Sequence, residues 1–241
     1  VSNSTFSNNV AKAKSNANGG AIYAKSDFTG GKHYFVNLTL NDTTFTGNQA
    51  NWGGAVFVTG EGTLTMNNVT FDGNTGTWGS ALAVYANRAY ESDLASVQPP
   101  VVTANNVNYL NNVSTGAGAV YLYTAAQYDQ TGGSFVNNTI KTSGTPYAGA
   151  VMVKGAQATF TDVLFENNVV ESTDSVATGG AVYVDKVENK TAGIIDGSVT
   201  FNVTKDFTYS GNNVIGNSDT INTYGYLTST AGGFLFLDRD T

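Results

Sequence analysis

The sequence predicts an all-β fold: a right-handed, single-stranded parallel β-helix, or solenoid, of about seven rungs with three strands each. Two short motifs recur in pairs along the 241 residues, and no apolar pattern of helical period is sustained anywhere. Glycine occurs 28 times, whereas charged residues make up only 12% of the chain. Many small residues combined with regularly placed β-formers are typical of an all-β protein with frequent turns.

The first motif is an aromatic residue followed three positions later by asparagine. Its occurrences are Phe6 with Asn9, Phe45 with Asn48, Phe71 with Asn74, Tyr109 with Asn112, Phe135 with Asn138, Phe165 with Asn168, and Tyr209 with Asn212. The second motif is two small residues, an alanine and an aliphatic residue. It follows the first at 19–22, 53–56, 79–82, 117–120, 148–151, 179–182 and, in degenerate form, 232–235. Ordered pairs of this kind indicate stacked repeats, each forming one turn of a coil.

The shortest repeat, from Phe45 to Phe71, shows the expected rung most clearly. Alternation of apolar and polar residues predicts strands at 55–58, 64–66 and 69–71, with turns at 60–62 and 67–68. Residues 72–78 are interpreted as a connection to the next small pair. Each strand must pair with its counterpart one rung on, about 4.8 Å away, which gives three parallel sheets around an apolar interior. Right-handed crossovers between parallel strands predict the hand of the coil.

The recurrent residues have structural roles in this arrangement. The aromatic rings fall in line from rung to rung and are expected to stack inside the coil. The asparagines tolerate a left-handed turn, and their amides can bond to the same residue of the next rung as a ladder. We therefore predict that all fourteen motif residues, aromatic and asparagine alike, build the coil.

Composition excludes several classes of partner. The net charge of −7 and the scattered basic residues argue against binding to nucleic acid or to an anionic membrane surface. No apolar run approaches the roughly 20 residues of a membrane-spanning helix, so no direct membrane insertion is expected. The absence of cysteine does not decide between a secreted and a cytosolic protein. Because Val1 falls within a repeat, we expect residues 1–241 to be one β-helix domain cut from a longer protein.

At its two motifs the sequence resembles the polymorphic outer-membrane proteins of chlamydiae, autotransporters whose passenger domains carry repeated GGA(I/L/V) and FxxN tetrapeptides. The resemblance covers nearly the whole chain, with departures where Ser80, Ala117 and Ala148 replace a glycine and Phe234 replaces the alanine. It implies a secreted adhesin passenger on the bacterial cell surface, associated with virulence and displayed through an outer-membrane β-barrel that this stretch lacks. The implied partners are a host-cell or matrix protein, a surface glycan, or another copy of the protein on a neighbouring cell.

A polysaccharide lyase or glycoside hydrolase is the alternative, because such enzymes also use a β-helix. They collect carboxylates on one sheet for acid–base chemistry or for calcium. Here the acidic residues Asp42, Asp72, Asp162, Glu166 and Asp206 fall in different rungs, and the lone histidine, His33, lies in an insertion. The cluster at 238–240 is interpreted as a solvated edge. We therefore expect no catalytic residue, metal site or cofactor.

Two sets of aromatic residues are candidates for ligand binding. Strand alternation after each small pair predicts an outward-facing column, which consists of Tyr23, Phe57, Ala83, Tyr121, Met152, Tyr183 and Phe236. Insertions at 24–37, 86–100, 123–132, 140–147, 170–178, 185–196 and 214–230 add loop aromatics, among them Phe28, Tyr34, Tyr90 and Tyr128. An apolar stripe on a surface usually marks a contact site, and loops on a rigid scaffold often carry recognition. The other interpretation of the column is that insertions fold over it and bury it.

Overall fold

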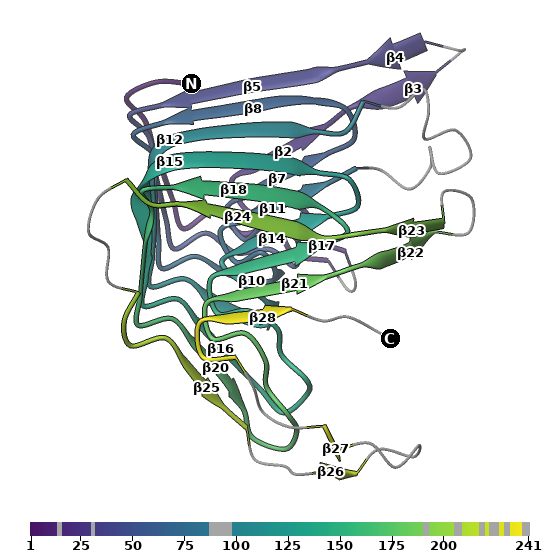
Figure 1. The fold of residues 1–241 in the computed structure, drawn as a ribbon. Helices are drawn as coiled ribbons and strands as arrows, with labels where there is room; N and C mark the ends of the chain where they lie inside the picture. Colours follow the sequence, from purple (N-terminus) through teal and green to yellow (C-terminus); the bar gives the residue numbers. More distant parts are fainter. Residues whose placement is uncertain are drawn as a thin grey trace.

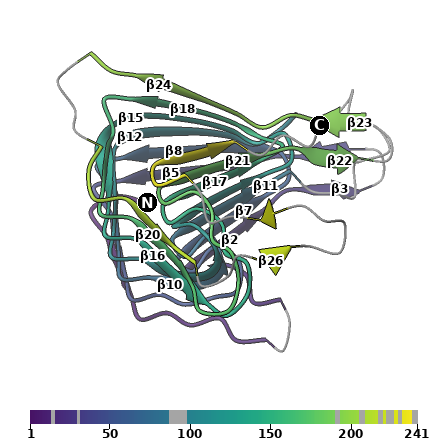
Figure 2. The same ribbon diagram turned by 60° about the horizontal axis from the view of Figure 1, so that its bottom comes forward.

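The structure is a computed structural model that describes residues 1–13, 16–29, 32–86, 98–189, 193–204, 209–216, 220–221, 227–228 and 232–237. Its described residues form strands, turns and bends, with no helix among them. Figure 1 shows the strands stacked rung upon rung from the N-terminal end to the C-terminal end. The view turned toward the coil axis shows three walls around a central interior (Figure 2).

The three walls are three parallel sheets. Sheet A contains β1 (Thr5–Ser7), β5 (Val36–Asn41), β6 (Thr44–Thr46), β8 (Gly62–Asn67), β9 (Thr70–Asp72), β12 (Val101–Leu110), β15 (Gln127–Val136), β18 (Gln157–Thr161), β19 (Leu164–Glu166) and β24 (Ser198–Asn202). Sheet B contains β10 (Thr75–Trp78), β13 (Val113–Ala117), β16 (Thr139–Thr142), β20 (Val169–Ser172) and β25 (Asn213–Ile215). Sheet C contains β2 (Ile22–Lys25), β7 (Val56–Thr59), β11 (Leu82–Tyr85), β14 (Val120–Tyr123), β17 (Val151–Lys154), β21 (Val182–Asp185) and β28 (Leu235–Leu237).

Each strand pairs with the equivalent strand of the next rung, as in the register Ile22↔Val56 and Val56↔Leu82 of sheet C. Sheet C has seven strands, one after each small-residue pair. The predicted parallel β-helix is therefore confirmed. Three antiparallel hairpins lie outside the sheets: β3 (Asp27–Thr29) with β4 (Lys32–Tyr34), β22 (Val187–Asn189) with β23 (Gly193–Ile195), and β26 (Thr220–Ile221) with β27 (Leu227–Thr228).

The prediction of three sheets was right, but the assignment of strands to them was wrong. The segments 64–66 and 69–71, expected in different sheets, both belong to sheet A, and β12 runs through both positions without a break. Sheet B is built from β10, which lies in the segment 72–78 that was interpreted as a connection. The segments 140–147 and 170–178, expected as insertions, overlap β16 and β20 of the same sheet.

Backbone conformation explains this difference. Asn68 and Asn106 share one register position and have φ of 53° and 52°, but they only kink sheet A. The corner to sheet B lies at the residue before each motif asparagine, where Gly73 and Asn111 have φ of 62° and 54°. Glycine and asparagine are the residues that adopt this left-handed conformation most readily. A single left-handed asparagine therefore signals either a kink or a corner, and sequence does not separate the two.

The motif aromatics stack inside the coil. Ring centroids are 4.9 Å apart for Phe6–Phe45 and Phe45–Phe71, 5.1 Å for Phe71–Tyr109, 4.5 Å for Tyr109–Phe135 and 4.8 Å for Phe135–Phe165, with interplanar angles of 12° or less. The stack ends at Tyr209, whose ring lies 6.0 Å from Phe165 at 60°. Phe234 replaces the motif alanine there and stacks on Tyr209 at 4.6 Å. The extra ring therefore turns Tyr209 out of line.

The motif asparagines form a continuous ladder at the corner between sheets A and B, from Asn9 to Asn212. Asn74 illustrates the pattern: its Nδ2 donates to Asn112 Oδ1 and to the Phe45 carbonyl, each at 3.0 Å. Its Oδ1 accepts from the backbone N–H and the side-chain amide of Asn48, each at 2.9 Å. Asn74 is fully buried, so these bonds replace water entirely.

Tyr128, expected in a loop insertion at 123–132, lies instead in β15 and is buried in the core. Its hydroxyl donates to Gln130 Oε1 at 2.6 Å and lies 3.0 Å from the Tyr109 hydroxyl. Gln130 is itself buried, and its Nε2 donates to the carbonyls of Val107 and Gly132. The polar Gln130 at an inward position hid the strand alternation, which is why the segment was interpreted as a loop.

We predict that Asn74→Ala destabilises the protein by about 2–6 kcal/mol, because two buried donors of Asn48 lose their acceptor at about 1–3 kcal/mol each. Asn105→Ala is the matched control: Asn105 is exposed and donates to Asn67 at 2.9 Å in an outer ladder, so its loss is expected to cost less than about 1 kcal/mol. Denaturant unfolding of both variants measures the difference. Equal losses would contradict the structural role of the buried ladder.

Burial raises the pKa of the Tyr109 and Tyr128 phenols above their ordinary value of about 10. Because the folded state holds both phenols neutral, the free energy of unfolding should be constant up to about pH 10 and fall as pH rises further. Tyr109→Phe, which keeps the stacked ring, should make that fall shallower, since one fewer buried proton is released. Unfolding measured between pH 8 and pH 11 checks this, with the exposed Tyr34→Phe as a control expected to show the unchanged slope. An unchanged slope in Tyr109→Phe would contradict the assignment.

Candidate functional site

The outer face of sheet C presents three rows of side chains that run from rung to rung. Row 1 comes from the corner before each strand, and its residues are Asn18, Trp52, Trp78, Ala117, Tyr147 and Thr178. Row 2 is the predicted outward column, and its residues before β28 are Tyr23, Phe57, Ala83, Tyr121, Met152 and Tyr183. Row 3 lies two positions further along each strand, and its residues are Lys25, Thr59, Tyr85, Tyr123, Lys154 and Asp185.

Row 2 points out from the sheet as predicted, but most of it is not exposed. Phe57 and Tyr121 are 4% exposed and Tyr183 is 3% exposed, so the expectation of an exposed column is corrected for these three residues. They form a second apolar cluster outside the coil, against which Trp52, Trp78, Tyr85 and Tyr147 pack. Rings from rows 1 and 3 therefore lean over row 2 and cover it. The alternative interpretation had the insertions cover the column, but the covering residues that the structure describes belong to the rungs themselves.

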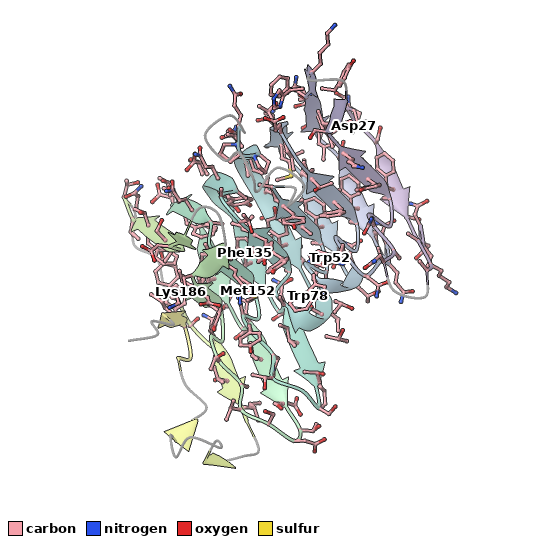
Figure 3. The ribbon with its side chains drawn as sticks, turned by 90° about the vertical axis from the view of Figure 1, so that its right-hand side faces the viewer. Asp27, Trp52, Trp78, Phe135, Met152 and Lys186 are labelled. Carbon is pink, nitrogen blue, oxygen red and sulfur yellow. The ribbon has the colours of Figure 1, made fainter. Side chains whose placement is uncertain are left out.

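Tyr23 differs because it belongs to the first rung. It is 46% exposed, and one face of its ring stacks on Phe57 at a centroid distance of 5.4 Å and an angle of 8°. The exposed part of the cluster therefore begins at Tyr23 and continues over the half-buried Trp52, Trp78 and Tyr85. Figure 3 shows Trp52 and Trp78 next to each other on this face, with Met152 toward the C-terminal rungs.

Two depressions lie among these rings. One, of about 340 Å³, is lined by Trp52, Trp78, Tyr85, Tyr121 and Tyr123. The other, of about 260 Å³, is lined by Asn16, Asn18, Tyr23, Lys25, Trp52, Phe57, Thr59 and Tyr85. Because Trp52 and Tyr85 line both, we treat the two depressions as one feature and name it the aromatic groove. It runs along the coil over the first four rungs.

Beneath the groove, row 2 carries an alanine where its neighbours carry rings. Ala83 lies between Phe57 and Tyr121 in the register of sheet C and is fully buried. Trp52 and Tyr121, two rungs apart, approach to 5.9 Å between ring centroids above it. Trp78 lies 5.4 Å from Tyr121. A ring at position 83 would occupy the space into which these rings converge.

The loop aromatics are distributed differently. Tyr34, in β4, is 55% exposed and lines neither depression. Phe28 lies in β3 opposite His33, and Phe236 lies in β28 opposite Tyr183, but their side chains lie outside what the structure describes. Tyr90 lies outside the described residues altogether. Of these four side chains, only that of Tyr34 is described, and it lies outside the groove.

His33 has a partner that the sequence did not indicate. Its Nδ1 lies 2.6 Å from Glu61 Oε2, and the Glu61 side chain is only 1% exposed. Glu61 Oε1 also accepts from the backbone N–H of Gln98 at 2.9 Å, and the Glu61 N–H donates to Ser26 Oγ at 2.7 Å. One buried carboxylate thus ties the β3–β4 hairpin and the chain at Gln98 to the turn before β8. Each carboxylate oxygen of Glu61 has a hydrogen-bond partner, so we assign this residue a structural role.

The remaining acidic candidates serve turns and ladders. Asp42 Oδ1 accepts from Asn68, Asp72 Oδ1 accepts from Asn111, and Asp162 Oδ1 accepts from the backbone N–H of Thr204. Asp206 and the 238–240 cluster lie outside the described residues. Within the part of the chain that the structure describes, no three His, Asp or Glu side chains gather as a metal site. Within the same residues, no helix is long and apolar enough to cross a membrane.

A larger depression, of about 600 Å³, lies on the outer face around sheet B. Its lining residues are Ala11, Lys12, Ala13, Gln49, Ala50, Asn51, Thr75, Gly76, Thr77, Val113 and Thr115. These are mostly small side chains, and among them only Lys12 is charged. The depression offers neither aromatic faces nor convergent polar groups of the kind that orient a ligand. The aromatic groove is therefore the better candidate site.

The sequence analysis missed four of the aromatic groove residues: Trp52, Trp78, Tyr85 and Tyr123. Signals for them exist. Each tryptophan directly precedes a small pair, and each tyrosine stands two positions beyond row 2, which by strand alternation faces the same side. The chain contains only two tryptophans, and both line the groove.

The coil and its groove define a β-helical repeat protein with an aromatic groove along one side. Residues 3–25 and 42–59 match the model of the Chlamydia polymorphic membrane protein repeat. These segments contain the aromatic motif and the small pair of the first rung, and both motifs of the second. The chain therefore carries repeats of the polymorphic membrane protein type, which confirms the resemblance seen in the sequence. Comparisons with curated proteins and with solved structures give no match.

We predict that Ala83→Leu closes the groove at its centre, because the added carbons enter the space into which Trp52 and Tyr121 converge. Overpacking of this kind should lower the free energy of unfolding by about 1–3 kcal/mol and shift the tryptophan fluorescence spectrum. Met152→Leu, a volume-conserving change at a buried position of the same row, should leave both nearly unchanged. An unaltered tryptophan spectrum in Ala83→Leu would show that residue 83 does not shape the groove.

Proposed function

We propose that this protein is a non-enzymatic adhesin passenger on a bacterial cell surface, which holds another surface through the side of its β-helix. The observation that carries the proposal is the aromatic groove on a coil built from polymorphic membrane protein repeats. Tryptophan and tyrosine are enriched among the residues that contribute most of the binding free energy at interfaces. On a stacked coil they are held in place by sheet C below them, so little ordering is needed when a partner binds.

The proposed location follows from the repeat type. The matching model is named for a membrane protein of chlamydiae, and an elongated coil suits a part that projects from a cell. The net charge of −7 and the low fraction of charged residues suit contact through rings and small polar groups rather than through charge. The partner in this proposal lies on a host cell, in the extracellular matrix or on a neighbouring bacterium.

The alternative, a polysaccharide-degrading enzyme, has less support. Such enzymes use two carboxyl groups about 5–9.5 Å apart across the scissile bond. Among the residues that the structure describes, those that line the two depressions of the groove include no aspartate or glutamate. The nearest carboxylate in row 3 is Asp185, and it forms an ion pair with Lys154 at 2.7 Å. A groove lined by rings, amides, a hydroxyl and one amine suits holding a ligand better than cleaving it.

An adhesion assay tests the proposal. Beads coated with the purified chain are counted on cultured epithelial cells and on bacteria that display the same chain. We expect retention well above that of uncoated beads on at least one surface, and a several-fold loss with Trp78→Ala. Tyr34→Ala, which removes an exposed ring outside the groove, is the matched control and should retain beads as the unaltered chain does.

Two results would overturn the proposal. One is bead retention no better than that of uncoated beads on every surface offered. The other is release of reducing or unsaturated sugar when the chain is incubated with a panel of polysaccharides, which would favour the enzyme instead.

A further inference from the structure

The rings of the aromatic groove follow the repeat of the coil. Tyr23 belongs to the first rung, Trp52 to the second, Trp78 and Tyr85 to the third, and Tyr123 to the fourth. Adjacent rungs of a parallel sheet are about 4.8 Å apart, so the groove spans roughly 14 Å along the coil axis. A ligand that lies along it meets a new aromatic side chain at each step.

The ring planes are suited to stacking. Trp52 and Trp78 lie 5.8 Å apart at 27°, and Trp52 and Tyr85 lie 6.3 Å apart at 24°. All three are half-buried, so each keeps part of its surface open to solvent. Tyr121 and Tyr123 are 4% and 9% exposed and form the wall behind them. Because these rings stack on one another, the parts of them that remain exposed form an apolar strip along the coil, with Tyr121 and Tyr123 behind it.

The N-terminal half of the groove supplies hydrogen-bonding groups beside the rings. Its lining includes the side-chain amides of Asn16 and Asn18, the hydroxyl of Thr59 and the ammonium group of Lys25. Amide and hydroxyl groups both donate and accept hydrogen bonds. They match a ligand that carries hydroxyl groups around an apolar ring face. The described part of the lining contains one amine and no carboxylate, and so offers little charge with which to select a charged ligand.

We infer that the aromatic groove binds a neutral oligosaccharide of pyranose rings that runs along the coil axis. This inference rests on the proposed function, because it names the chemistry of the surface that the adhesin holds. The C–H faces of pyranose rings stack on Trp52, Trp78, Tyr85 and Tyr23, and their equatorial hydroxyls reach Asn16, Asn18, Lys25 and Thr59. About three linked rings occupy the groove, at roughly one ring for each step between rungs.

A proline-rich peptide is the rival occupant, because aromatic-lined grooves also bind polyproline segments. Such a peptide presents carbonyl groups that accept hydrogen bonds, but it has no hydroxyl groups to donate hydrogen bonds to the amide oxygens of Asn16 and Asn18. The two asparagines and Thr59, placed together beside the rings, favour the sugar. Binding of a proline-rich peptide at the groove would count against the inference, and decaproline is therefore one of the ligands tested.

The purified chain is titrated with tri- and tetrasaccharides of glucose, mannose and N-acetylglucosamine, with oligogalacturonate as an acidic counterpart and with decaproline. Since both tryptophans line the groove, intrinsic fluorescence reports its occupancy, and calorimetry gives the dissociation constant independently. We expect saturable binding of at least one neutral oligosaccharide. Tyr85→Leu should weaken binding by up to about tenfold, the loss of one aromatic contact, whereas Tyr85→Phe should keep most of it.

Trp78→Ala should weaken the same binding by a similar factor, and Tyr34→Ala should leave it unchanged. Far-ultraviolet circular dichroism of every variant establishes that the coil is intact, and Tyr85→Phe keeps the test decisive if Trp78→Ala fails to fold. The inference is overturned if no neutral oligosaccharide in the panel binds, if Tyr85→Leu binds as well as the unaltered chain, or if decaproline or oligogalacturonate binds instead.

Failure of this inference differs from failure of the proposed function. If no sugar binds but Trp78→Ala still reduces bead retention on cells, the adhesin proposal stands and the ligand class is wrong. If neutral sugars bind at the groove but no cell surface retains the beads, the sugar site stands and adhesion is wrong.

Discussion

At the five inner corners between sheets A and B, from Asn48 to Asn168, the chain turns an asparagine side chain inward, where water does not reach. Its amide must then find partners within the protein, because a buried polar group without a hydrogen bond costs about 1–3 kcal/mol. The partners are the same asparagine of the next rung and the carbonyl of a motif aromatic. A rung therefore satisfies its own corner only when another rung is stacked on it. This mutual dependence fixes the register of all three sheets and aligns the aromatic stack.

The ladder also explains where variation is possible. Residues that face inward are held by the rungs on both sides, as Phe71 is by Phe45 and Tyr109. When one inward position changes, as with Phe234 in place of alanine, the effect appears inside the coil as the tilted Tyr209. Outward positions have no such constraint. In row 2 the sequence changes from phenylalanine to alanine to tyrosine over three rungs without disturbing the register. The groove at Ala83 is a product of that freedom.

The fold followed from the sequence because each motif residue has one physical role that repeats in every rung. The boundaries were harder: a left-handed asparagine is compatible with both a kink and a corner, so Asn68 was interpreted as a turn between sheets. The polar Gln130 interrupted the apolar alternation of an inward-facing strand. The sequence does not show the hydrogen-bond partners that allow its amide to be buried. Of the residues that line the groove, the sequence predicted only Tyr23, Phe57 and Tyr121 as candidates. The alternation of side chains along each strand correctly predicted that Phe57 and Tyr121 point outward. It could not predict that the rings of Trp52 and Trp78 cover them. The tie between His33 and Glu61 joins elements distant in sequence, and no local pattern signals it.

In the proposed function, contact with another surface takes place at the aromatic groove rather than at the loops or at the faces of sheets A and B. Hydroxyl-radical footprinting of the bead-bound chain, before and after the beads adhere to cells, tests it most directly because oxidation reads the exposure of individual side chains. The claim predicts that oxidation of Trp52, Trp78 and Tyr85 falls on adhesion while that of Tyr34 does not change. Unchanged oxidation of the three groove residues, with protection appearing on sheet A, sheet B or the hairpins, would contradict it.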